Sequence, residues 1–409
     1  MRVGILLENY KKEEGGSHSY YNTLVEGIAD YNFSDNLEFA FVALGDSLDK
    51  SAPDNSFLLD IEKIMRSNNK FLFWINKLAS IKGISYFPLS DKIQFSYTKR
   101  FNEELKAKLI ENKIDVLYAL TPFYKDLNFP TIVTHWDIGH KSSFMLPEVT
   151  FDGEYEMREM YYDRYLQKAF AIFCESEAGK NELCHYKQIN PERVFVIPMF
   201  AGNITKLVID GDTEKQVLDK FNIKTNKFFL YPAQFWSHKN HYSLIMAFQK
   251  FQKESPEVKL LLPGGDKGNL KYIKQLVNDL NLNDNIIFGG FVTNQELNVF
   301  YKNAISLVMP TVIGPTNMPP LEAKALNCQV ICTDMPGHRE TLGDYAIYIN
   351  PYDVDNIFAA LNSTFDNIAD KKNTEHNSST LLNSLAKIEE AFTKLVSIRK
   401  LFGTDFRIE

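Results

Sequence analysis

The chain has 409 residues, of which 44% are hydrophobic and 24% charged, and its formal net charge is −7. This length is sufficient for two or more domains, and the composition is that of a folded globular protein rather than a disordered chain. The negative charge argues against a nucleic-acid-binding surface, so we expect no nucleic-acid partner. No stretch approaches the ~20 apolar residues of a membrane span.

The cysteines and the amino terminus indicate the compartment. The chain contains four cysteines: Cys174, Cys184, Cys328 and Cys332. They form no CxxC pair and have no histidine at zinc-site spacing, so we expect free thiols, a reducing compartment and no metal site. The apolar run from Val3 to Leu7 is too short for a signal peptide and is interpreted as a first β-strand. We therefore expect a cytoplasmic protein.

Short apolar runs alternate with helical patterns along the chain, which is typical of parallel sheets built from βαβ units. In the first half the predicted strands are VGILL (from Val3), FAFVAL (Phe39), DVLYAL (Asp115), PTIVTH (Pro130), AIFCES (Ala171) and VFVIPM (Val194). In the second half they are FFLYPAQ (from Phe228), KLLLPGG (Lys259), NIIFGGF (Asn285), ISLVMPT (Ile305), QVICTD (Gln329) and AIYINP (Ala346). The fold class is therefore α/β, with two Rossmann-like, doubly wound domains.

Polar segments divide the chain. The turn-rich segment 202–227 separates the two series of strands, and the stretch DKKNTEHNSS precedes a last helix with apolar residues at helical spacing. We place the first domain at residues 1–203, the second at 204–375 and a C-terminal helix at 376–409. Ligands of such sheets bind beyond the carboxyl ends of the strands, so the chemistry is expected in the loops that follow strands.

Two of these loops could hold an anion. Gly15 and Gly16 precede a helix and would let an anion approach its free N–H groups, although a flexible surface turn is the alternative. Lys239 also lies just before a helix and could place its charge on a diphosphate, whereas a solvated lysine beside a helix cap is the alternative. A third loop, THWDIGH, contains His135, Asp137 and His140.

The THWDIGH loop and Glu322 each allow two interpretations. In the THWDIGH loop, one residue could act as a base or orient an acceptor hydroxyl, or the loop could hold a capping aspartate and a core histidine. In PPLEAKAL, Glu322 starts an apolar helix after two prolines, which suit a helix entry. A glutamate there is either stabilised by the helix dipole alone or serves a ligand.

Taken together, these loops resemble the GT-B glycosyltransferases of family 4, which transfer a sugar from a nucleotide sugar with retention at the anomeric carbon. The resemblance covers nearly the whole chain and is strongest where YPAQFWSHKNH, LLPGG, IIFGGFVTNQELNVFYKNAISLVMPT and GPTNMPPLEAKALNCQVICTDMPGHRETLGDYAIYINP follow in the family's order and spacing. It implies a GT-B fold: an acceptor-binding domain and a nucleotide-sugar-binding domain face a central cleft, and the last helix crosses back to the first domain.

The resemblance also implies roles for individual residues. Glu322 would be the second glutamate of the family's E-x7-E motif and would bind the ribose hydroxyls. The other donor-binding residues it implies are Gly15, Gly16, Gln234, Lys239, Phe291, Val292, Thr316, Asn317 and Met318. Asp137 and His140 would lie on the acceptor side and, with Lys239, form the catalytic set.

Three positions depart from the family's pattern. Gly314 stands where the first motif glutamate contacts the donor sugar, Gln234 stands where many relatives have an arginine, and Trp136 stands where some have the histidine. The resemblance implies a metal-independent retaining hexosyltransferase without a cofactor. Its acceptor would be a glycan or lipid-linked saccharide in bacterial surface polysaccharide or glycoconjugate synthesis. The alternatives are a non-catalytic nucleotide-sugar or carbohydrate-binding protein and another GT-B enzyme, such as a nucleotide-sugar epimerase.

One further segment, residues 57–83, combines basic residues with Phe71, Phe73 and Trp74. A basic, aromatic amphipathic segment can lie in a lipid interface, so the segment predicts peripheral contact with the inner face of the membrane. The alternative is an ordinary packed helix with a solvated basic face.

Overall fold

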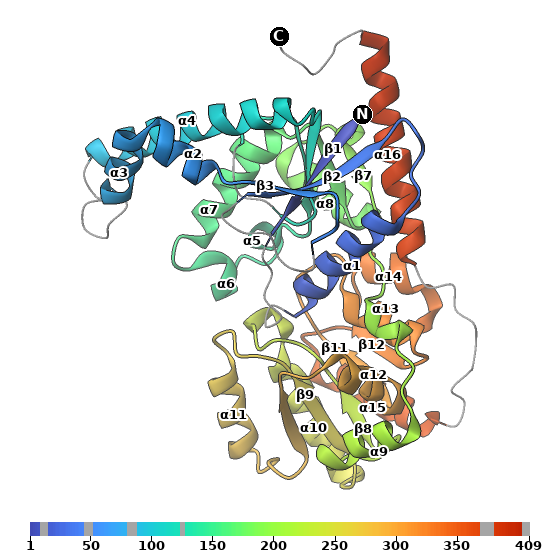
Figure 1. Ribbon diagram of the computed structural model, residues 1–409. Coiled ribbons are helices and arrows are strands. Elements are labelled where there is room, and N and C mark those ends of the chain that lie inside the picture. The colour runs from blue at the N-terminus through green and yellow to red at the C-terminus, as the bar shows by residue number, and fades with distance from the viewer. Residues whose placement is uncertain (9–14, 45–51, 80–87, 123–126, 369–379, 403–409) are drawn as a thin grey trace.

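The computed structural model describes residues 1–8, 15–44, 52–79, 88–122, 127–368 and 380–402, and it contains two parallel β-sheets, one in each of two domains (Figure 1). The boundary between residues 375 and 376 and the stretch DKKNTEHNSS lie outside the described residues. The boundary between residues 203 and 204 stays a prediction.

The first sheet has seven strands in the order β3-β2-β1-β4-β5-β6-β7. Its strands are β1 (Arg2–Leu7), β2 (Glu38–Leu44), β3 (Ser56–Leu59), β4 (Val116–Ala119), β5 (Thr131–His135), β6 (Ala171–Cys174) and β7 (Val194–Val196). The second sheet has six strands in the order β10-β9-β8-β11-β12-β13. They are β8 (Phe228–Leu230), β9 (Lys259–Pro263), β10 (Ile286–Gly290), β11 (Ser306–Met309), β12 (Gln329–Thr333) and β13 (Ala346–Ile349). In both sheets every strand pair is parallel, as expected. Each strand predicted from the sequence overlaps one of these strands, so the predicted strands are confirmed.

Helices cover the faces of both sheets (Figure 1). In the first domain they are α1 (Gly16–Asp30), α2 (Ile61–Asn68), α3 (Lys70–Ala79), α4 (Pro88–Glu111), α5 (Gly139–Ser142), α6 (Pro147–Thr150), α7 (Glu154–Met160) and α8 (Glu177–Lys187). In the second they are α9 (Gly211–Lys220), α10 (His241–Glu254), α11 (Leu270–Asp279), α12 (Asn294–Asn303), α13 (Met318–Ala325), α14 (Pro336–Leu342) and α15 (Val354–Asp366), followed by α16 (Leu381–Phe402).

The helical layers explain why the strands are apolar throughout. Strands β4 and β11 are buried at every position, because helices lie on both faces of a parallel sheet and neither alternating set of side chains meets water. This is why the strands appear in the sequence as continuous apolar runs rather than as an alternation.

The last helix, α16, follows the second domain along the chain but packs against the first (Figure 1). Its Phe392 ring lies 5.5 Å from Phe39 and 5.8 Å from Phe173, measured between ring centroids. The Ser384 hydroxyl donates a hydrogen bond to the Pro198 carbonyl at 2.7 Å. These contacts link the end of the chain to the core of the first domain.

The segment 57–83 differs from its sequence-based interpretation. Its first residues form the edge strand β3, which pairs with β2, and only the following residues form α2 and α3. Residues 57–59 thus belong to the edge of the sheet, and the membrane contact stays a prediction for the helices that follow. On α3, Phe71 and Trp74 are exposed, and residues 80–83 of the segment lie outside the described residues.

Candidate functional site

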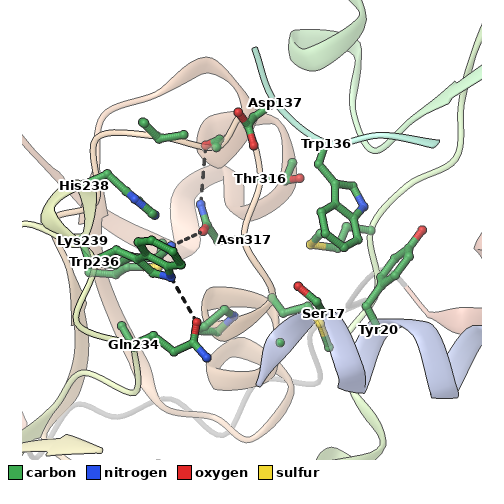
Figure 2. A pocket seen from close by; sticks show the side chains of 18 of the residues that line it. Ser17, Tyr20, Trp136, Asp137, Gln234, Trp236, His238, Lys239, Thr316 and Asn317 are labelled. Carbon is green, nitrogen blue, oxygen red and sulfur yellow. Dashed lines mark hydrogen bonds between the residues drawn. The ribbon is translucent and has the colours of Figure 1, made fainter. Parts of the chain in front are cut away.

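A cavity of about 350 Å³ lies between the two domains, at the carboxyl ends of the strands (Figure 2). Trp136 and Asp137 follow β5, Gln234 follows β8, and the loop from Gly314 to Asn317 follows β11. Within each sheet, parallel strands deliver their following loops to the same edge, and here these edges of the two sheets meet at the cavity. The expected central cleft is therefore present.

Lys239 lies in the cleft at the end of a short 3-10 turn before α10. The next residue, Asn240, adopts a left-handed backbone conformation with φ 54° and accepts a hydrogen bond from the Ser243 N–H, which caps α10. The Tyr231 hydroxyl donates to the Lys239 carbonyl at 2.9 Å. These contacts fix the backbone at Lys239, so that its side chain extends into the cavity (Figure 2).

The ammonium group of Lys239 makes no ion pair within the described part of the chain. Its Nζ atom donates to the Asn317 side-chain oxygen at 3.3 Å. Burial lowers the pKa of Lys239 to about 8, against the opposing effects of Asp137 and Glu148. A partly buried cation whose partner is a neutral amide is suited to an anionic ligand.

Two helix amino termini also meet the cleft. Helix α1 begins at Gly16 after Gly15, whose φ is 66°, and it has no side-chain cap and no acidic residue in its first turn. Helix α13 begins at Met318 and also lacks a side-chain cap. Gly16, Ser17 and Met318 line the cavity. Uncapped N–H groups and the positive ends of helix dipoles favour an anion between the two helices.

The loop from Gly314 to Asn317 is held by a chain of hydrogen bonds. Burial lowers the pKa of His338 to about 4, so its ring is neutral. Its Nδ1–H donates to the Thr333 carbonyl at 2.8 Å, which leaves Nε2 to accept from the Asn317 amide at 3.2 Å. The Asn317 oxygen is thereby directed at Lys239. Helix α14 approaches this loop so closely that a Cβ atom at Gly337 would lie 1.7 Å from the Pro315 carbonyl oxygen.

Glu322 is buried in the first turns of α13. Its Oε2 atom accepts a hydrogen bond from the Tyr301 hydroxyl at 3.1 Å, and the Gly202 N–H also donates to its carboxyl group. A Cβ atom at Gly202 would lie 2.7 Å from Glu322 Oε1, so a larger residue there would force the Glu322 side chain to move. Burial raises the pKa of Glu322 to about 7, and the two hydrogen bonds oppose that rise. Glu322 is not among the residues that line the cavity.

Of the three residues in THWDIGH, only Asp137 lines the cleft. Burial acts to raise its pKa, but Arg158, 3.1 Å from Oδ1, and the Gly139 N–H outweigh burial and lower it. His140 is fully buried and bonds through Nε2 to Glu159 at 2.7 Å. The Nδ1 atom of His135 lies 3.2 Å from the Tyr162 hydroxyl, and burial lowers the pKa of His135 to about 4.

Two cleft-lining carboxyl groups of the first domain reach the second domain. Glu148 accepts hydrogen bonds from the His238 backbone N–H and from its Nδ1 atom, each at 2.7 Å. Glu175 accepts a hydrogen bond from the Thr316 hydroxyl at 2.5 Å, and burial raises its pKa to about 8. Both groups join the two walls of the cleft.

The remaining predicted site residues lie in different positions. Gln234 lines the cleft and accepts from the Trp236 indole N–H at 3.1 Å, and a Cβ atom at Gly15 would lie 3.6 Å from its Nε2 atom. Thr316, Asn317 and Met318 also line the cavity. Neither Phe291, whose side chain is 60% exposed, nor Val292 does.

Sequence reasoning missed several cleft residues: Ser17, Tyr20, Glu148, Arg158, Glu175 and Trp236. Glu175 directly follows β6, so the rule that ligands bind beyond strand ends could have indicated it. Glu148 and Arg158 come from the short helices α6 and α7, and no local pattern announces their approach to the cleft. Trp136 lines the cavity with its ring edge-on to Tyr20 at 5.9 Å (Figure 2).

Among the described residues, no helix is both long and apolar enough to cross a membrane. Within the same residues, no group of three or more histidine, cysteine, aspartate or glutamate side chains could hold a metal ion.

Residues 212–379 match the family model described as "Glycosyl transferases group 1". The chain is 28% identical over 213 residues to the O-antigen chain mannosyltransferase RfbU of Salmonella typhimurium, covering 49% of this chain and 56% of that protein. It is 27% identical over 222 residues to the serotype-specific mannosyltransferase WbdA of Escherichia coli, covering 52% of this chain and 27% of that protein. The chain thus spans about half or less of the length of these relatives.

Solved structures are similar over almost the whole chain. A glycosyltransferase from Rickettsia africae superimposes with a TM-score of 0.65 at 14% identity, covering 97% of this chain and 98% of that one. The Anabaena protein Alr3699/HepE, in complex with UDP and glucose, gives a TM-score of 0.64 at 13% identity, covering 96% of this chain and 100% of that one. The predicted GT-B fold, with two facing Rossmann-like domains, is confirmed.

Proposed function

We propose that this chain, whose residues 212–379 match the glycosyl transferases group 1 family model, is a retaining glycosyltransferase that transfers a hexose from a nucleoside-diphosphate sugar. The acceptor we propose is a glycan or a lipid-linked saccharide of bacterial surface polysaccharide or glycoconjugate synthesis. The O-antigen chain and serotype-specific mannosyltransferases among its relatives support this acceptor class.

One observation carries the proposal: Lys239 extends into the cleft with no carboxylate bound to it within the described residues, and the uncapped amino termini of α1 and α13 meet the same cleft. The departing nucleoside diphosphate gains negative charge in the transition state. The ammonium group and the two helix termini would stabilise that charge without a divalent cation.

The proposed reaction occurs on one face of the sugar. The bond between the anomeric carbon and the phosphate oxygen breaks, and a bond from the acceptor oxygen to the same carbon forms. The acceptor hydroxyl proton passes to the departing phosphate oxygen. Asp137, kept ionised by Arg158, would orient the acceptor hydroxyl, because a carboxylate accepts its hydrogen bond. Glu322 would bind the ribose hydroxyls once the nucleotide enters.

We further propose that the acceptor is met at the inner face of a membrane. On α3, the exposed Trp74 ring lies 5.6 Å from the Arg66 guanidinium carbon and 5.3 Å from Lys77 Nζ, and Phe71 is 80% exposed. Aromatic rings beside basic groups suit the headgroup region of an anionic bilayer.

A binding protein without turnover is the rival function, supported by Gly314 and Gln234 in place of the family's glutamate and arginine. Purified protein should be titrated with UDP-, GDP-, ADP- and dTDP-linked hexoses, and nucleoside diphosphate release should be measured in each case. Binding with release, by hydrolysis or transfer, supports the enzyme. Tight binding without release supports the rival, and no binding contradicts both.

A further inference from the structure

Glu175 is a buried carboxyl group in the cleft that the proposed mechanism leaves without a role. It follows β6, is 5% exposed and lines the cavity. Its Oε2 atom accepts from the Thr316 hydroxyl at 2.5 Å, whereas Oε1 is buried without a hydrogen-bond partner among the described residues. A buried polar atom without a partner is unfavourable, so the free oxygen calls for a partner that enters the cleft.

A contact between the two domains accounts for only one of the two Glu175 carboxyl oxygens. Glu340 links the domains outside the cavity with both of its oxygens, which accept from the backbone N–H groups of Glu177 and Ala178 at 2.9 and 3.0 Å. Both oxygens of Glu340 are used between protein groups. Glu175 uses one oxygen in this way, and its other oxygen has no hydrogen-bond partner among the described residues.

On the opposite wall of the cleft, the chain lacks a carboxyl group at position 314. Gly314 stands where the family's pattern has a sugar-binding glutamate, and its φ of 97° disfavours any side chain. A Cβ atom there would lie 3.3 Å from both the Asn317 amide nitrogen and the Thr316 carbonyl oxygen. With glycine at position 314 the second domain presents no carboxyl group there, while Glu175 reaches the same loop from the first domain.

Resting on the function proposed above, we propose that Glu175 is a sugar-binding residue, whose free carboxyl oxygen hydrogen-bonds a hydroxyl group of the donor hexose. It supplies from the first domain the carboxyl group that position 314 lacks. The donor sugar would then be held by both domains, and its binding would depend on a closed cleft.

The charge state of Glu175 suits a neutral hydroxylated sugar. Burial raises the pKa of Glu175 to about 8, Asp137 adds to the rise and the bond from Thr316 opposes it. The group is therefore protonated at neutral pH. An uncharged carboxylic acid both donates and accepts, which matches a sugar hydroxyl, and it avoids a second negative charge near Asp137.

The test compares a nucleoside diphosphate with its hexose conjugate, for example UDP with UDP-glucose and GDP with GDP-mannose, by calorimetric titration. In Glu175→Ala, the Kd of the conjugate should rise about three- to tenfold, the effect of one lost hydrogen bond, with no change in the Kd of the nucleoside diphosphate. Glu175→Gln should stay within about threefold of the wild type for both ligands, because an amide also donates and accepts.

Glu340→Ala is the matched control, since it removes a cross-domain carboxylate outside the cavity. It should not separate the conjugate from the nucleoside diphosphate. Equal weakening of both ligands by Glu175→Ala, wild-type binding by that variant, or a sugar-selective loss in Glu340→Ala would each overturn the inference. A sugar-selective loss in Glu175→Gln as large as in Glu175→Ala would overturn the uncharged form. If the wild type bound no nucleoside diphosphate and no conjugate, the proposed function itself would fail, which is a distinct result.

Discussion

Replacing Glu322 by glutamine should stabilise the protein and weaken donor binding at the same time. Burial raises the pKa of Glu322 from the ordinary 4.5 to about 7. As the pH rises from 4.5 to 7, the unfolded chain loses this proton while the folded protein keeps it, so the folded state loses stability. At about 1.4 kcal/mol for each pKa unit, the loss near pH 8 amounts to at most ~3 kcal/mol, and the glutamine variant avoids it.

The same substitution should raise the Kd of the nucleotide by roughly ten- to a hundredfold, because a charge-assisted hydrogen bond to the ribose contributes ~1.5–3 kcal/mol. Thermal melts across the pH range and calorimetric titration measure the two effects. Glu296 provides a matched control. Burial acts to raise the pKa of Glu296, but Lys220 and Thr293 outweigh burial and lower it. Glu296→Gln should therefore destabilise the protein near neutral pH and leave nucleotide binding unchanged. Normal nucleotide binding by Glu322→Gln, or a melting temperature below that of the wild type near pH 8, would refute this reasoning.

Three further outcomes are expected. Turnover should persist in excess chelator, because Lys239 and the helix termini replace a cation; activity that disappears and returns only with magnesium or manganese would contradict this. Asp137→Asn should lower turnover about a hundredfold or more with little change in donor affinity, whereas His140→Gln should alter stability rather than turnover; the reverse pattern would exchange their roles. Vesicles of anionic lipid should sediment the wild type at low salt and sediment less of a Phe71→Ser, Trp74→Ser variant; failure of the wild type to bind would remove the membrane contact.

The fold could be predicted from the sequence because central strands of both sheets are buried on both faces. Runs such as those of β4 and β11 are apolar without alternation and are separated by helical patterns, which together favour parallel sheets. Strand β3 was missed because its four residues, SFLL, are separated from α2 by Asp60 alone. In the sequence they therefore read as part of the apolar pattern of that helix. An edge strand this short has no pattern of its own.

Only those site residues that lie in loops after strands could be predicted from the sequence. Lys239 and Thr316 lie in loops after β8 and β11, and both line the cleft as expected. His140 was expected in the same site but lies beneath it, bonded to Glu159, since the turn after Asp137 directs its ring into the domain. Arg158 reaches Asp137 from α7, a contact set by how α7 packs and not by any spacing in the sequence.

The most direct test of the central claim is the release of nucleoside diphosphate from a bound nucleotide hexose by the wild type and by Lys239→Ala, measured in a single turnover. We expect the wild type to release it and to form a product that retains the anomeric configuration. Lys239→Ala should lose more in the rate of release than in donor affinity, because the charge that Lys239 opposes grows in the transition state. Release by Lys239→Ala at the wild-type rate, or donor binding by the wild type without release, would contradict the account.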